Sequence, residues 1–268
     1  MNNIGRIVFG CIAAVIIIAA IILLIPFGMS AENAKKVADD AFANLEEKSA
    51  SAKYLQIDSE YYSLYFYNPK KLGDASGDVI GRIDFNKAQV KEDGTAVDGA
   101  YTSGSIIIGK MKVKDTTDEY KWYVIKTAVN GKEGDTKGYK TFATMNEATS
   151  YASSTFPQAS MMIRNLEKNL YNIMADFVRP AGDNSQVTGG SKAIAGAASV
   201  TIESTDKNTI ETLQISNNLI KKCTVTMKDG EKTVTQSVSF KYNGELKMAD
   251  ALLKGLTEFS DTPTTDGE

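Results

Sequence analysis

The sequence IVFGCIAAVIIIAAIILLIPFGM, at residues 7–29, decides the architecture of the chain. It contains no charged residue, and its one strong helix breaker, Pro26, lies near its end. At a rise of about 1.5 Å per residue, about 20 apolar residues cross a hydrocarbon core of roughly 30 Å. The segment therefore predicts a single-pass transmembrane anchor that follows a short N-terminal tail at residues 1–6.

A cleaved signal peptide is the main alternative to a permanent anchor. Gly28 and Ser30 are small residues at the −3 and −1 positions of a cut before Ala31. A signal peptide, however, usually has an apolar region of only about 7–15 residues, and this one is longer. We therefore favour an uncleaved anchor.

The charges around the anchor and the length of the following domain favour opposite orientations. Lys35, Lys36 and Lys48 follow the segment, whereas Arg6 precedes it. A count of these charges favours a cytoplasmic domain, but long domains translocate largely regardless of charge. We expect an anchor in the plasma (inner) membrane, with an extracytoplasmic domain at residues 30–258.

The composition excludes several classes of function. The chain has no histidine, which removes the commonest general base and metal ligand. Its net charge of −3 provides no basic field for nucleic acid. Cys11 lies in the apolar segment and Cys223 in a strand-like run, so no disulfide is expected. An exported domain without disulfides fits a bacterial cell envelope.

Motifs for catalysis and cofactor binding are also missing. There is no phosphate-binding loop and no Gly-x-Ser-x-Gly nucleophile elbow. Asp74, Asp78 and Asp84 surround a glycine-rich turn, but their spacing does not match a calcium-binding loop. We expect no catalytic residue, no metal site and no cofactor, and hence a protein that is not an enzyme.

Periodicity predicts two helices in the domain. Residues 30–54 form an amphipathic pattern that Ser30 can cap. Residues 155–179 carry a wide apolar face, with Pro157 in the first turn and Pro180 after the end.

Strands, a linker and a tail account for the rest of the domain. Alternating or β-branched patterns predict strands at residues 60–67, 79–90, 101–113, 119–129, 139–144, 198–204, 209–216, 219–228 and 233–242. Residues 181–198 indicate a flexible internal linker, residues 246–257 a short helix, and residues 259–268 a disordered acidic tail.

These elements predict an α+β fold, in which a curved antiparallel β-sheet packs on one or two helices. In the last four strands the expected core is Ile202, Ile210, Leu213, Ile215, Val225, Met227, Val234, Val238 and Phe240. The layout resembles the half-barrel cradles of bacterial envelope lipid carriers, at the level of fold alone.

The aromatic sequence EYYSLYFY, at residues 60–67, is the strongest candidate for a binding site. It can be core packing, or it can line an apolar cavity in which tyrosine hydroxyls orient a ligand. The cavity would lie between the sheet and the helix at residues 155–179. Its expected lining is Tyr61, Tyr65, Phe66, Met162 and Leu166.

Two functions follow from this interpretation. The first is a membrane-anchored, non-catalytic binding module for a lipid or another apolar ligand. The alternative is a structural or adaptor subunit of a bacterial cell-envelope assembly, whose surface binds another envelope protein.

Overall fold

The computed structural model of the chain describes residues 26–51, 54–67, 79–91, 94–113, 119–132, 135–178, 184–242, 244 and 250–259. Most of the predicted anchor and of the acidic tail therefore lies outside the described residues. No helix in the described part of the chain has the length and apolar character that crossing a membrane requires.

The prediction that the transmembrane segment continues to residue 29 is wrong. Residues 26–29 form strand β1 (Pro26–Met29) and pair with strand β8 (Ser185–Ala193). Proline has no N–H to donate, so it interrupts a helix but is tolerated at the first residue of an edge strand. The apolar segment that can form an anchor therefore ends at residue 25.

The predicted α+β class and antiparallel sheet are confirmed. The strands are hydrogen-bonded in a 13-stranded order, β1-β8-β9-β10-β11-β12-β2-β3-β4-β5-β6-β7-β13. Among the described ladders, only the pairing of β13 with β7 is parallel. The chain divides into two compact units. Unit 1 comprises residues 1–47 and 177–237, and unit 2 comprises residues 48–176 and 238–268.

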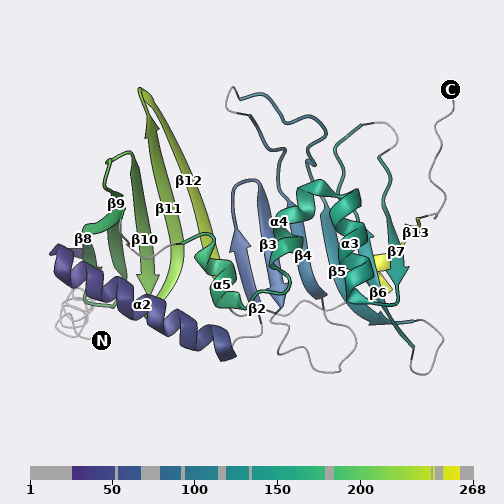
Figure 1. Cartoon of the computed structure of the whole chain (residues 1–268), viewed down its shortest axis with the longest axis horizontal. Helices are drawn as coiled ribbons and strands as arrows, with labels where there is room; N and C mark the ends of the chain where they lie inside the picture. Colours follow the sequence, from purple (N-terminus) through teal and green to yellow (C-terminus); the bar gives the residue numbers. More distant parts are fainter. Residues whose placement is uncertain are drawn as a thin grey trace, which may run out of the picture. The chain divides into compact units, whose positions relative to one another are not determined.

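Unit 1 contains one long helix, α2 (Ala31–Ser51), which begins near the residue expected from the sequence. Figure 1 shows α2 running across strands β8 to β11. Its buried stripe is Ala34, Ala38, Ala41 and Leu45, all at most 3% exposed. The other strands of unit 1 are β9 (Ala198–Ser204), β10 (Thr209–Ser216), β11 (Leu219–Asp229) and the first part of β12 (Lys232–Lys241).

The predicted linker at residues 181–198 is largely strand β8, which pairs with β1 on one side and β9 on the other. Because of its glycines, this segment shows no alternating strand pattern in the sequence. The same glycines permit close contact with a neighbouring strand. A Cβ added at Gly190 would lie 2.2 Å from the carbonyl oxygen of Ser199. Glycine in this strand therefore permits close backbone approach rather than flexibility.

The predicted core of unit 1 is correct only in part. Ile202, Leu213 and Ile215 are at most 4% exposed, whereas Met227 and Val234 are 42% and 49% exposed. Alternation in the sequence identifies the apolar face of a strand but not how far along the strand that face is covered.

The sheet of unit 2 is covered on both faces, by short helices on one and by the C-terminal segment on the other. Its strands are β2 (Tyr54–Asp58), β3 (Tyr62–Tyr67), β4 (Val79–Phe85), β5 (Ser105–Lys112), β6 (Tyr120–Lys126), β7 (Gly138–Phe142), β13 (Thr257–Glu258) and the end of β12. Its helices are α3 (Met145–Thr155), η2 (Pro157–Ala159), α4 (Ser160–Asn165), α5 (Leu170–Ala175) and η3 (Asp250–Leu253).

The predicted helix at residues 155–179 is divided, and a helix precedes it. Thr144 and Glu147 form a capping box that starts α3, and α3 ends at Thr155, two residues before Pro157. The side chain of Asn169 accepts a hydrogen bond from the N–H of Asn172 and starts α5. The prediction of helical structure in this stretch is correct, but these caps and the proline divide it into short helices. Part of the helix expected at residues 246–257 lies outside the described residues; of the rest, Asp250–Leu253 form the single turn η3, and β13 begins at Thr257.

Candidate functional site

Three of the five predicted lining residues lie together in the core of unit 2. Phe66, Met162 and Leu166 are at most 2% exposed. Strand β4 approaches them closely, because a Cβ added at Gly81 would lie 2.3 Å from Cδ2 of Leu166 and 3.3 Å from Sδ of Met162. Contact at this distance is that of close-packed core.

The other two predicted residues lie apart from these three. Tyr65 is next to Phe66 in β3, so its side chain is on the opposite face of the sheet. There the guanidinium carbon of Arg82 lies 5.5 Å from the centre of its ring. Tyr61 precedes β3, and Nζ of Lys87 lies 4.8 Å from the centre of its ring. The structure therefore does not bring the five residues into one cavity, and ligand binding by them stays a prediction.

A partnered polar network occupies the sheet face beside Tyr65. Nε of Arg82 donates a hydrogen bond to Oδ1 of Asp84 at 2.6 Å, and the hydroxyl of Ser105 donates to the same oxygen. These contacts satisfy the carboxylate of Asp84, one of the three aspartates that surround the glycine-rich turn. The other two aspartates, Asp74 and Asp78, lie outside the described residues.

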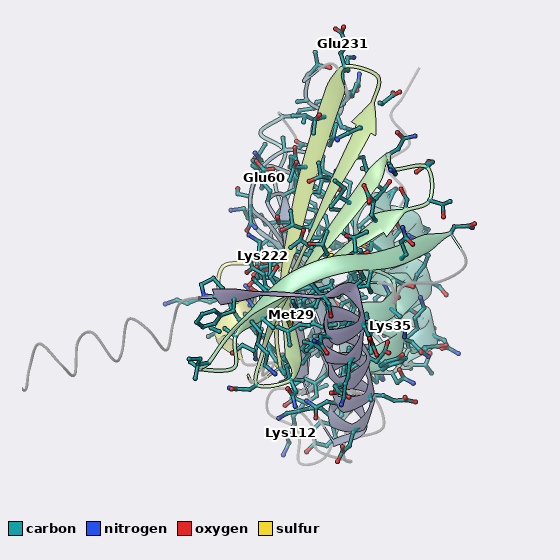
Figure 2. All side chains as sticks on the ribbon, turned by 90° about the vertical axis from the view of Figure 1, so that its left-hand side faces the viewer. Met29, Lys35, Glu60, Lys112, Lys222 and Glu231 are labelled. Atoms are coloured by element: carbon teal, nitrogen blue, oxygen red, sulfur yellow. The ribbon has the colours of Figure 1, made fainter. Side chains whose placement is uncertain are left out.

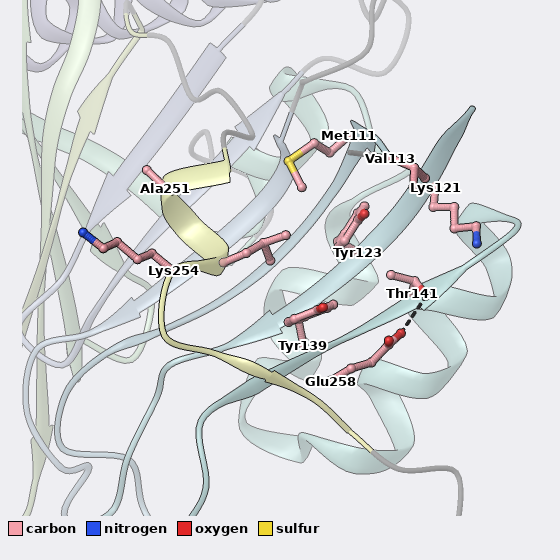
Figure 3. Close-up of a pocket in the computed structure, with 10 residues that line it drawn as sticks. Met111, Val113, Lys121, Tyr123, Tyr139, Thr141, Ala251, Lys254 and Glu258 are labelled. Carbon is pink, nitrogen blue, oxygen red and sulfur yellow. Dashed lines mark hydrogen bonds between the residues drawn. The ribbon is translucent and has the colours of Figure 1, made fainter. Parts of the chain in front are cut away.

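A pocket of about 680 Å³ lies further along this same face, between β5–β7 and the C-terminal segment. The register connects the two regions, because Arg82 pairs with Ile107 in β5 and Ile107 with Ile125 in β6. The pocket is lined by Met111, Val113, Lys121, Tyr123, Tyr139, Thr141, Ala251, Leu253, Lys254 and Glu258. Figure 3 shows Tyr123 and Tyr139 side by side on adjacent strands beneath the turn of η3.

The C-terminal segment forms one wall of the pocket and is held on the sheet by apolar contacts and a short strand. Leu252, Leu253 and Leu256 pack against a buried cluster that includes Met111 and Tyr123. Strand β13 then pairs with β7 over two residues. The hydroxyl of Thr141 donates a hydrogen bond to Oε1 of Glu258 at 2.9 Å (Figure 3).

The pocket has an apolar body, with polar groups toward both ends. The rings of Tyr123 and Tyr139 lie with their centres 6.0 Å apart and present both carbon surface and hydroxyl groups. Lys254 lies at one end and Lys121, Thr141 and Glu258 at the other (Figure 3). Ligand pockets typically have volumes of roughly 300–1,000 Å³ and combine apolar walls with a few polar groups. This pocket fits that description.

The described residues contain neither a metal-binding cluster nor a reactive cysteine thiol. No group of three or more acidic, cysteine or histidine side chains in the described part of the chain is arranged to hold a metal ion. The thiol of Cys223 is buried and donates to Oε1 of Glu211 at 3.1 Å. Burial, with the nearby Glu211 carboxylate, raises the pKa of the Cys223 thiol and keeps it protonated.

Replacing Gly138 by valine is expected to release the C-terminal segment from β7. A Cβ at Gly138 would lie 2.6 Å from the carbonyl oxygen of Thr257 and 2.7 Å from the ring of Phe259. We expect a local loss of about 1–2 kcal/mol. It should appear as faster hydrogen exchange at the Phe259 N–H, which donates to the carbonyl oxygen of Tyr139. Lys137→Val is the control, because Lys137 is exposed next to Gly138; equal exchange in both variants would contradict the prediction.

The sequence does not predict this pocket, although it predicts several of the elements that form it. The sequence predicts a strand at residues 119–129, in which Tyr120, Trp122 and Val124 share one face, and a short helix at residues 246–257. The pocket forms on the other face of β6, where Lys121 and Tyr123 alternate with those residues. Only the pairing of the C-terminal segment with β7 shows that the two meet.

Comparison with protein-family models, with characterised proteins and with solved structures finds no match to this chain, so no activity, ligand or partner is carried over to it.

Proposed function

We propose that the chain is a single-pass, membrane-anchored and extracytoplasmic binding module for a lipid or another apolar ligand, without catalytic activity. The observation that supports this function most strongly is the pocket under the C-terminal segment. Its walls suit an apolar body, and Lys121, Thr141 and Glu258 suit a polar head that makes hydrogen bonds. The anchor at residues 7–25 would hold this module at the plasma membrane.

The proposal uses this pocket, and the class of ligand is the one expected from the sequence. Met162 and Leu166, two of the lining residues expected from the sequence, pack tightly on β4. Met111 and Leu253 supply the adaptable and branched apolar surface on the opposite face of the sheet. A ligand there would separate η3 from the sheet and add buried apolar area.

Native mass spectrometry of residues 26–268, purified without detergent, tests this proposal. The protein begins at Pro26 because β1 is part of the sheet. We expect extra mass that organic solvent removes. A bare monomer mass, together with failure to bind added fatty acids or phospholipids, would contradict the proposal.

Partly filling the pocket should weaken binding without disturbing the core. Ala251 lines the pocket and is exposed, so Ala251→Phe adds a ring at the wall of the pocket. We expect at least about a tenfold weaker affinity for a fluorescent fatty acid, equivalent to about 1.4 kcal/mol. Ala251→Ser leaves the space open and should bind like the unmodified protein. Equal affinities of the two variants would place the ligand elsewhere.

The alternative, an adaptor subunit of a cell-envelope assembly, has one supporting observation. Met227 and Val234 are large apolar side chains on β11 and β12, and both are more than one third exposed, at 42% and 49%. A partner protein would cover such side chains. We keep this function as the second candidate, favoured if the monomer carries no ligand.

A further inference from the structure

Strand β1 connects the predicted anchor directly to an edge of the sheet of unit 1. It pairs antiparallel with β8 over its whole length, from Pro26 opposite Ala193 to Met29 opposite Gly190. The residue at which the chain enters the fold therefore lies beside the end of β8. Ile194, which follows β8, is brought to this point although it is far from Pro26 in the sequence.

Two exposed apolar side chains lie at this edge. Phe27 is 53% exposed and Ile194 is 60% exposed, the two highest values among the large apolar residues in the described part of the chain. Lys192 pairs directly with Phe27 and is exposed. A phenyl ring, a branched aliphatic side chain and an ammonium group together suit the boundary between acyl chains and lipid headgroups.

The length of the anchor brings this edge to that boundary. Residues 7–25 are 19 apolar or uncharged residues. As a helix they would extend about 28 Å, close to the roughly 30 Å of a hydrocarbon core. Strand β1 begins at the next residue, so no linker would separate the sheet from a membrane that residues 7–25 cross.

We propose that the β1–β8 edge, formed by Phe27, Lys192 and Ile194, docks on the surface of the bilayer in which the chain is anchored. The two apolar side chains enter the headgroup region, and the ammonium of Lys192 binds lipid phosphates. The covalent connection at Pro26 holds the edge there, and the surface fixes the orientation of unit 1. This inference rests on the anchor of the proposed function but not on the pocket.

Brominated lipids test the docking in the full chain. Trp122 is the only tryptophan, so Trp122→Phe removes the native signal and Ile194→Trp adds a single reporter. The protein is reconstituted into vesicles of phosphatidylcholine and phosphatidylglycerol with brominated acyl chains, which quench tryptophan on contact. Flotation of the vesicles first shows whether the chain is inserted.

A matched reporter at Val234→Trp provides the control. Val234 is 49% exposed in unit 1, three residues after Glu231, which Figure 2 shows at the tip of the β11–β12 hairpin, away from Met29 in β1. Both positions are open enough to accept an indole without disturbing the core. Adding Lys192→Glu to the Ile194→Trp protein should reduce quenching, because a carboxylate repels anionic headgroups.

The docking predicts loss of emission and a shift to shorter wavelength at position 194, with unchanged emission at position 234. An inserted chain with no quenching at position 194 would overturn the docking while the anchor stands. Equal quenching at both positions would contradict docking specifically through the β1–β8 edge. A chain that does not float with the vesicles would overturn the anchor and the docking together.

Discussion

Replacing Asp135 by asparagine is expected to destabilise unit 2 by about 3 kcal/mol at neutral pH. Nζ of Lys126 donates to Oδ1 of Asp135 at 2.6 Å and to the carbonyl oxygen of Thr136 at 2.7 Å. The two side chains are only 7% and 11% exposed. The other carboxylate oxygen accepts the N–H of Asn130 at 2.6 Å. An amide has one acceptor oxygen, so the variant loses one of these contacts and leaves the buried ammonium without its counter-charge.

The dependence on pH follows from the same contacts. Burial alone would raise the pKa of Asp135, but hydrogen bonds from Lys126 and the Asn130 N–H outweigh it and hold the pKa below its usual value. A carboxyl with a lowered folded-state pKa stabilises the protein fully above its unfolded pKa, about 3.9, and loses this contribution as pH falls through the folded pKa. The difference between the native protein and Asp135→Asn should therefore shrink below about pH 4.

Chemical unfolding monitored by the fluorescence of Trp122, which lies in unit 2, measures both effects. Asp98→Asn is the control, because Asp98 pairs with Lys132 at 2.6 Å while its side chain is 89% exposed. Exposed ion pairs contribute little, so we expect a change within about 0.5 kcal/mol. Equal losses in the two variants would show that burial does not strengthen the Lys126–Asp135 pair.

Replacing Gly104 by alanine is expected to cost about 3 kcal/mol. Gly104 has a φ of +84°, a conformation that side chains disfavour. A Cβ there would also lie 2.2 Å from the carbonyl oxygen of Thr127 and 2.8 Å from Cα of Ala128. These are backbone atoms at the end of β6, so they cannot rotate away as the end of a side chain can.

Gly131→Ala separates backbone conformation from steric contact. Gly131 has a similar φ of +77°, but nothing lies within 4 Å of an added Cβ. Conformation alone should cost about 1 kcal/mol at this position. Urea unfolding of both variants gives the comparison. If Gly104→Ala were no more destabilising than Gly131→Ala, the close approach to Thr127 would carry no energetic weight.

Local pattern was sufficient for most strands and for helix α2. Residues 212–216 alternate polar and apolar side chains, and β10 has the predicted bounds, 209–216, in the structure. The stripe of Ala34, Ala38 and Ala41 is likewise buried as its spacing indicates. In both cases one face of one element carries the information, and that information lies within a few consecutive residues.

Contacts between segments that are far apart in the chain could not be predicted from local sequence patterns. The pocket depends on β13 pairing with β7, which brings Glu258 to Thr141 across more than a hundred residues. Such a pairing of two residues leaves no local periodicity. The five residues predicted to line one cavity do not share one face of the sheet. Tyr65 and Phe66 are adjacent in a strand, so their side chains lie on opposite faces.

The interleaving of the two units also sets a time scale for biosynthesis. Unit 1 contains residues 1–47 and then residues 177–237, with most of unit 2 between them. At a translation rate of roughly 5–20 residues per second, the end of α2 leaves the ribosome about 7–27 s before β8, the first strand after residue 177 in unit 1. A single amphipathic helix is only marginally stable in water, so unit 1 completes its fold late, after residues 48–176 have been synthesised. Truncations within β10 or β11 should therefore leave α2 open to proteolysis.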